Sequence, residues 1–115
     1  MKYGSIAAGE QTTLEAACHI LESGGNAFDA AVASAFTSMT SEFALTSAGG
    51  GGALLALPYN SEPILFDFFV DTLPVGNKNL DFFPVIIDFG TRKQNFNIGK
   101  GSVAVPGNIA GLLHV

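Results

Sequence analysis

The sequence predicts an α+β fold in which helices form a layer against a small antiparallel sheet. Two stretches with helical spacing come first, between residues 12 and 39, and two apolar runs at residues 53–57 and 64–70 then flank a turn-rich segment. Near the end of the chain, a Pro-Gly turn precedes a further helix start. Because the helices are grouped ahead of a hairpin and do not alternate regularly with strands, this class is favoured over a doubly wound sheet.

The first predicted elements are a short strand and a helix. Residues 5–8 form an apolar run bounded by glycines, which is typical of a buried strand. Thr12 and Glu15 have the Thr-x-x-Glu spacing of a capping box, and two glycines at positions 24 and 25 end the helix. Its apolar face is predicted to comprise Leu14, Ala17, Cys18 and Leu21.

The second helix has the clearer start signal. Asn26 is predicted to cap it, and Asp29 places a carboxylate in the first turn, where it meets the positive end of the helix dipole. The other faces carry small residues, so the helix is expected to pack closely on more than one side. Its large apolar stripe consists of Phe28, Val32, Phe36 and Met39.

The remaining elements are a hairpin, an irregular connection, a strand and a last helix. Residues 53–57 and 64–70 are predicted to pair across a turn at residues 58–63. Residues 75–100 are predicted to be irregular, because proline, aspartate and glycine interrupt their apolar positions. Residues 102–105 are predicted to form a strand that turns at Pro106-Gly107 into a helix beginning near Asn108.

Composition narrows the classes of function. The net charge of −5, with five Lys and Arg in 115 residues, lacks the basic footprint of proteins that bind nucleic acids or anionic membranes. Charged residues make up only 13% of the chain, and its last five residues are largely apolar, so we expect a piece of a larger protein. One cysteine and two histidines provide neither a disulfide nor a zinc ligand set, and no metal or cofactor is expected.

No membrane anchor or signal peptide is predicted. Residues 30–61 contain a single charged side chain, Glu42, but their hydroxyl groups, glycines and proline are unsuited to a lipid-facing helix. The first residues lack the apolar core of a signal peptide. Localisation therefore stays open between the cytoplasm and export after trimming.

The residues that could carry chemistry form no recognisable active site. The four-glycine run at residues 49–52 lacks the Gly-Lys-Ser/Thr of a phosphate loop and precedes a strand, so it is interpreted as allowing unusual backbone angles or close approach of a neighbouring backbone or ligand. No serine lies in a Gly-x-Ser-x-Gly elbow. Surface, core or capping roles are the default for His19 and for Asp67, Asp71, Asp81 and Asp88, while His114 receives no assignment.

Several motifs nevertheless occur in a characteristic order. Residues 24–33 read Gly-Gly-Asn-Ala-Phe-Asp-Ala-Ala-Val-Ala, and residues 46–52 read Thr-Ser-Ala-Gly-Gly-Gly-Gly after Glu42. Residues 103–107 read Val-Ala-Val-Pro-Gly and precede Gly111-Leu112. This order closely resembles the γ-glutamyltransferase family over most of residues 4–74 and 101–113, with departures such as Glu10-Gln11 in place of the family's common His-Pro.

The resemblance implies a fragment of an N-terminal-nucleophile hydrolase, whose fold is a four-layer αββα sandwich. Residues 1–115 would be the N-terminal part of the large subunit of a precursor that cuts itself into two chains. Such enzymes transfer or hydrolyse γ-glutamyl groups of glutathione and related amides through an acyl enzyme on the threonine freed by the cut, whose own amine is the base. That threonine is expected outside these residues, so the isolated chain should be inactive. The implied partners are a small γ-glutamyl substrate and the rest of the precursor.

One family site falls inside the chain. The family segment Asp-Phe-Arg-Glu-Thr-Ala-Pro contains an arginine that holds the α-carboxylate of the donor, and residues 68–74 read Phe-Phe-Val-Asp-Thr-Leu-Pro. Aligned on Thr72 and Pro74, Val70 takes the place of the arginine and Asp71 that of the glutamate, which makes these two the candidate substrate-binding residues. Valine cannot provide a charge-assisted clamp, and the nearest cation, Lys78, lies beyond the motif.

Three explanations stay open for Val70, besides its being simply the end of a hairpin strand. Another residue supplies the charge, the donor lacks a free α-carboxylate, or activity has been lost. Two functional hypotheses follow: the chain belongs to a γ-glutamyltransferase-like enzyme or a related acylase with a different donor, or it is a noncatalytic, truncated or degenerate remnant.

Overall fold

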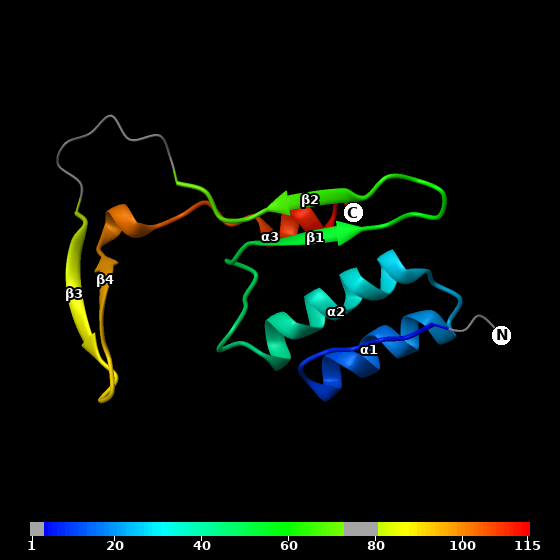
Figure 1. Cartoon of the computed structure of the whole chain (residues 1–115), viewed down its shortest axis with the longest axis horizontal. Helices are drawn as coiled ribbons and strands as arrows, with labels where there is room; N and C mark the ends of the chain where they lie inside the picture. Colours follow the sequence, from blue (N-terminus) through cyan, green and yellow to red (C-terminus); the bar gives the residue numbers. More distant parts are fainter. Residues whose placement is uncertain (1–3, 73–80) are drawn as a thin grey trace. The chain divides into compact units, whose positions relative to one another are not determined.

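The computed structural model describes residues 4–72 and 81–115 and confirms a mixture of helices and antiparallel strands (Figure 1). It divides into two compact units, Met1–Val70 with Pro106–Val115, and Asp71–Val105. The first unit contains α1 (Gln11–Glu22), α2 (Ala27–Ser41), β1 (Gly52–Ala56), β2 (Ile64–Phe68) and α3 (Asn108–Leu112). The second contains β3 (Phe83–Asp88), β4 (Lys93–Ile98) and the 3₁₀ turn η1 (Lys100–Ser102).

Helix α1 begins two residues earlier than the sequence predicts, with its cap at Glu10 and not at Thr12. Its N-cap is Glu10, whose Oε2 accepts a hydrogen bond of 3.0 Å from the backbone N–H of Thr13. The predicted capping box of Thr12 and Glu15 is therefore wrong. Thr12 lies inside the helix and donates its hydroxyl to Glu10, while Glu15 accepts from the side chain of Gln11. The predicted end is confirmed, because the helix stops before Gly24, whose φ of 95° suits glycine.

A polar cluster ties the start of α1 to the end of α2. The buried hydroxyl of Thr13 lies 3.1 Å from Ser41 Oγ and donates to Glu42 Oε2 at 3.2 Å. Ser34 in turn donates to the backbone carbonyl of Thr13. Ala17 and Ala30 are buried as well, so the two helices pack closely through small side chains. Figure 1 shows the two helices side by side.

Glu10 should make the stability of this helix pair depend on pH. The backbone hydrogen bond from Thr12, more than any other contact, lowers the pKa of Glu10 below its ordinary value of 4.5. A lowered pKa in the folded state means that the carboxylate stabilises the fold above that value, and that this contribution is lost as the pH falls through the folded pKa.

The variant Glu10→Gln should accordingly lie below the wild type in stability at pH 7 and approach it in acid. The measurement is the urea midpoint of both proteins between pH 7 and pH 3. Glu22→Gln, at the other end of α1, is the matched control and should follow the wild type. Parallel curves for Glu10→Gln and the wild type over the whole range would contradict this assignment.

Helix α2 has the predicted start. Asn26 Oδ1 accepts from the backbone N–H groups of Phe28 at 2.7 Å and Asp29 at 3.1 Å, and Asp29 Oδ2 accepts from the Asn26 N–H at 2.9 Å. The capping box is thus complete. The members of the large apolar stripe are half-buried, and Ala30 is buried on the face toward α1. The close packing predicted from the small residues is thus seen on the face toward α1, while Ala27 and Ala31 are exposed.

The first hairpin is confirmed with slightly shorter strands. β1 pairs with β2 antiparallel, from Gly52 opposite Phe68 to Ala56 opposite Ile64. Residues 54–57 line a cavity together with Ala27, Phe28 and Ala31 of α2, so α2 lies against this hairpin. The alternation of the strand buries Ala56 and leaves Leu55 72% exposed on the opposite face.

Residues 5–8 do not form the predicted strand. A strand requires a neighbour with which its backbone can pair, and none of the described residues forms a ladder with this segment. Its apolar composition is real, but composition alone does not supply a pairing partner.

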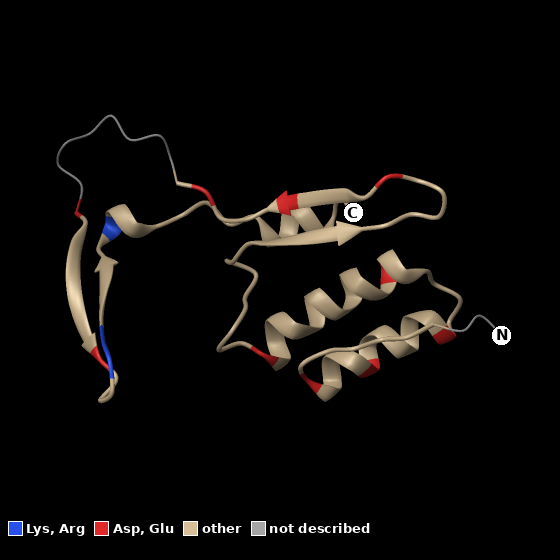
Figure 2. Cartoon of the chain, viewed as in Figure 1, with Lys and Arg blue, Asp and Glu red and all other residues tan. Residues whose placement is uncertain are grey.

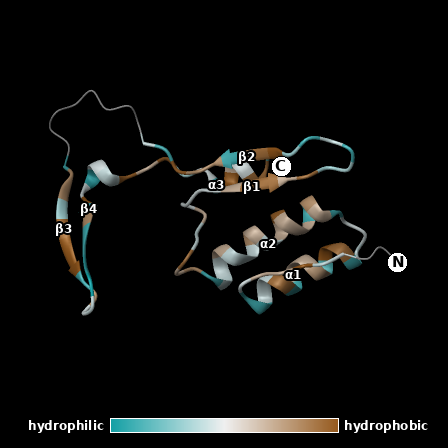
Figure 3. Cartoon of the chain, in the orientation of Figure 1, coloured by the Kyte–Doolittle hydropathy of each residue, from teal (hydrophilic) through white to brown (hydrophobic). Residues whose placement is uncertain are grey.

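The second unit contains a hairpin where an irregular connection was predicted. β3 and β4 pair antiparallel from Phe83 opposite Ile98 to Asp88 opposite Lys93, so the prediction is wrong for residues 83–98. Residues 75–80 lie outside the described residues. β3 is largely hydrophobic and β4 largely hydrophilic (Figure 3), which hides the hairpin from a search for two apolar runs.

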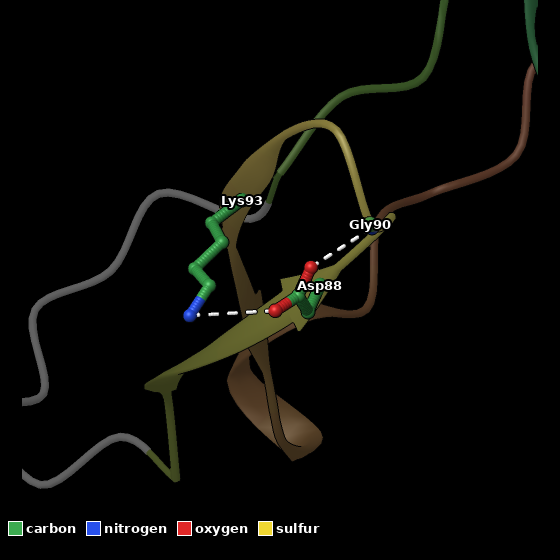
Figure 4. Close-up of polar contacts among 3 residues, drawn as sticks. All are labelled: Asp88, Gly90 and Lys93. Carbon is green, nitrogen blue, oxygen red and sulfur yellow. Dashed lines mark hydrogen bonds and ion pairs between the residues drawn. The ribbon is translucent and has the colours of Figure 1, made fainter.

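The three interrupting residues are compatible with this hairpin for separate reasons. Phe89 N donates to Arg92 O at 2.9 Å, and because bonded pairs alternate along the ladder, Pro84 falls at a position whose N–H would point away from β4. Asp88 accepts from the Gly90 N–H at 2.8 Å and pairs with Lys93 Nζ at 3.3 Å (Figure 4). Gly90 has a φ of 82°, which suits the turn.

The strand predicted at residues 102–105 is also wrong. Ser102 ends η1, and only Val105 takes part in β pairing, through an isolated bridge to Asp71. The turn at Pro106-Gly107 and the helix start at Asn108 are confirmed by α3. Within the described part of the chain, no helix has the length and apolar character needed to cross a membrane.

Candidate functional site

The two candidate substrate-binding residues lie shortly after β2, which ends at Phe68 and is followed by Phe69. Val70 is half-buried and belongs to the first unit, whose N-terminal segment ends at this residue. Asp71 is exposed and is the first residue of the second unit. Asp71 pairs with Val105 through two backbone hydrogen bonds, and its Oδ1 accepts from the Thr72 N–H at 2.8 Å. Pro74 and Lys78, used to align and assess this segment, lie outside the described residues.

The four-glycine run lies directly against the end of β2. A Cβ atom placed on Gly51 would overlap the backbone of Phe69 and Val70, and one on Gly107 would overlap the carbonyl of Phe68. None of residues 49–52 has a positive φ. Of the two roles proposed for the run, close approach of a neighbouring backbone is therefore the one observed, and unusual backbone angles are not.

Asn108 connects α3 to the same run. It is 5% exposed, and its Nδ2 donates to the carbonyl of Ser47 at 2.7 Å. The backbone N–H groups of Gly107 and Asn108 both donate to the carbonyl of Gly50 at 3.0 Å. The sequence predicted only that a helix starts near Asn108, because this residue directly follows a Pro-Gly turn. No local pattern indicated its hydrogen-bond partners, Ser47 and Gly50.

Electrostatics set what this arrangement can bind. The described residues of the first unit, 4–70 and 106–115, include no lysine or arginine (Figure 2). Val70 offers an apolar side chain and backbone groups, and the neighbouring Asp71 contributes a negative charge. Val70 and the described residues of its unit therefore supply no lysine or arginine that could pair with a carboxylate.

The other candidates have local structural roles, as expected by default. Asp67 accepts from the Phe69 N–H, Asp81 from the Lys100 N–H, and Asp88 from the Gly90 N–H. His19 is exposed, and the ring of His114 packs edge-on against Phe66 with centroids 6.2 Å apart. Cys18 is a free, half-buried thiol. No three His, Cys, Asp or Glu side chains in residues 4–72 and 81–115 are grouped to hold a metal ion.

Comparison with solved structures identifies the fold class. The structure of gamma-glutamyltranspeptidase from Pseudomonas nitroreducens complexed with L-DON matches 99% of this chain with a TM-score of 0.71 and 28% sequence identity. The match spans 33% of that protein's chain. The described elements thus form part of an N-terminal-nucleophile hydrolase fold.

Sequence comparison identifies the family. The sequence model described as gamma-glutamyltranspeptidase matches residues 13–115. The glutathione hydrolase proenzyme of Pseudomonas aeruginosa is 34% identical over 110 residues, and glutathione hydrolase proenzyme 1 of Schizosaccharomyces pombe is 35% identical over 111 residues. These alignments cover 95% and 96% of this chain but only 19% and 16% of the relatives. The chain belongs to the gamma-glutamyltranspeptidase family.

Proposed function

We propose that this chain is the N-terminal part of a precursor that cuts itself and then transfers or hydrolyses an acyl group of an amide. The catalytic threonine would lie in the part of the protein outside these residues, and its freed amine would act as the base. The family match over residues 13–115 carries this proposal. The relatives from P. aeruginosa and S. pombe, both called glutathione hydrolase proenzymes, support it.

The rest of the same precursor is the proposed partner. Among the described residues, the only buried hydrophobic side chains are Ala17, Ala30, Ala56 and Leu112. Leu55, Leu57 and Phe69, on or beside the first hairpin, are 72%, 73% and 69% exposed. An apolar sheet face of this kind is typical of a surface that another layer covers, which supports packing against the remainder of the protein.

Val70 and Asp71 are proposed to contact the acyl donor at the end of β2. Of the three explanations left open for Val70, we favour a donor without a free α-carboxylate. The absence of lysine and arginine from the described part of the first unit supports this choice, as does the negative charge of the adjacent Asp71. A buried or half-buried carboxylate without a cationic partner would bind poorly.

Two matched anilides test the proposed activity on the full-length protein. γ-Glutamyl-p-nitroanilide carries the α-carboxylate, and 4-aminobutanoyl-p-nitroanilide lacks it but keeps the amine. We expect release of p-nitroaniline, with a kcat/KM about tenfold higher for the second donor, because one unpaired charged group costs about 1.4 kcal/mol or more. Release from neither anilide would favour the noncatalytic remnant. A clear preference for the γ-glutamyl donor would refute the proposed donor class.

A further inference from the structure

We propose that Asn108 is a positioning residue that fixes the end of β2, and with it the donor-contacting backbone at Val70, by holding the four-glycine run in place. This inference rests on the proposed function of Val70 as a donor contact. It concerns a residue outside the motif from which the donor site was inferred.

The first link joins Asn108 to the glycine run. Its side-chain amide donates to Ser47 O at 2.7 Å, just ahead of the run, while its backbone N–H donates to Gly50 O at 3.0 Å. Asn108 thereby holds two carbonyl groups, those of Ser47 and Gly50. Because Asn108 is 5% exposed, water does not readily replace its amide, and loss of the amide would leave the bond to Ser47 unmade.

The second link joins the glycine run to Val70. The α-carbon of Gly51 lies so close to the backbone of Phe69 and Val70 that no side chain would fit between them. Gly107, the residue before Asn108, lies equally close to the carbonyl of Phe68. The end of β2 therefore contacts both the glycine run and Gly107, and the backbone N–H groups of residues 107 and 108 hold these two segments together by donating to Gly50 O. A shift of Asn108 would consequently be transmitted to Val70.

The side-chain amide is not needed to cap the helix. The N-cap of α3 is Gly107, and Asn108 is the first helical residue, with its amide directed to Ser47. If residue 108 served only to start α3, many other residue types could occupy this position equally well. Fixing Ser47 requires a donor at this position, and a carboxylate of the same shape would instead face the Ser47 carbonyl oxygen unfavourably.

The test compares Asn108→Ala and Asn108→Asp with Ile109→Ala in the full-length protein. Ile109 is the next residue of α3, is 40% exposed and donates no side-chain hydrogen bond, so its variant controls for weakening of the helix. Both Asn108 variants should raise KM for 4-aminobutanoyl-p-nitroanilide about tenfold, with kcat changed less than twofold, because the loss of a hydrogen bond of about 1.4 kcal/mol corresponds to tenfold. Hydrogen exchange should accelerate about tenfold relative to Ile109→Ala at the Gly50 amide, which donates to Ser47 O, and at the Gly107 amide, which donates to Gly50 O.

Two outcomes would overturn the proposal. One is a KM for the Asn108 variants equal to that of Ile109→Ala; the other is exchange at the Gly50 and Gly107 amides that matches the control. If the wild type turns over neither anilide, the proposed function has failed, and the exchange comparison alone decides whether Asn108 fixes the end of β2. Unchanged exchange then refutes the positioning role, and accelerated exchange supports it independently of catalysis.

Discussion

Alanine in place of Gly51 is expected to destabilise the protein by about 3 kcal/mol. The added Cβ would overlap the backbone of Phe69 and Val70, and backbone atoms directly after a paired strand cannot move away as a flexible side chain can. One of the two segments must therefore shift, which weakens the contact between the glycine run and β2. The measurement is the free energy of unfolding in urea for the variant and the wild type.

The same run provides a matched control. A Cβ atom on Gly49 would have Ser47 Oγ as its nearest neighbour at 3.7 Å, an ordinary van der Waals contact. Gly49→Ala is expected to stay within about 1 kcal/mol of the wild type or to gain slightly, because alanine restricts the unfolded chain. If the two variants unfold at the same urea concentration, close approach at Gly51 does not explain the glycine run.

Arginine in place of Val70 is expected to raise kcat/KM for γ-glutamyl-p-nitroanilide about 10- to 100-fold in the full-length protein. A guanidinium group at this position would supply charge-assisted hydrogen bonds to the α-carboxylate, and such bonds contribute about 1.5–3 kcal/mol. The rate with 4-aminobutanoyl-p-nitroanilide should not rise, because that donor has no carboxylate to pair. Initial rates over a range of both donors provide the measurement.

Two further variants separate charge from size at this position. Val70→Lys supplies a point charge without the planar fork and should give a smaller gain, whereas Val70→Met adds length without charge and should give none. Thermal unfolding of each variant monitors stability, because Val70 is half-buried. An equal gain for both donors with Val70→Arg would mean that the residue does not face the α-carboxylate.

Local signals were sufficient for the two long helices, although not for every boundary. Asn26 and Asp29 form the predicted capping box because both partners lie within one turn of the chain. At α1 two local caps compete, and Glu10 prevails with Thr13 as its partner. Thr13 is buried and contacts Ser41, the last residue of α2, and Glu42, its C-cap. Helical periodicity in the sequence cannot reveal these contacts.

Strand errors had a different physical origin. β3 and β4 were missed because Pro84 and Asp88 interrupt the apolar pattern, yet both fit the ladder once the register is known. Residues 5–8 and 102–105 both have the composition of strands. Residues 5–8 pair with no described segment, and in residues 102–105 only Val105 pairs, with Asp71. Strand formation depends on a second segment, which a single run of sequence does not specify.

The candidate site was accessible from the sequence only as an alignment. Val70 and Asp71 were placed by a motif, while the contacts around them come from distant segments. Gly51 reaches Val70 across the first hairpin, and Asn108 bonds to Ser47, 61 positions earlier. Contacts at such separation follow from topology, so the structural role of the four-glycine run became evident only with the fold.

The intact mass of the full-length protein after purification tests the central claim most directly. A self-cutting precursor of this family should yield two chains whose masses sum to that of the translated sequence plus one water, with threonine at the start of the smaller chain. This chain would then lie at the N-terminal end of the larger one. A single uncut polypeptide, stable over days and inactive toward both anilides, would contradict the account and leave the noncatalytic remnant in its place.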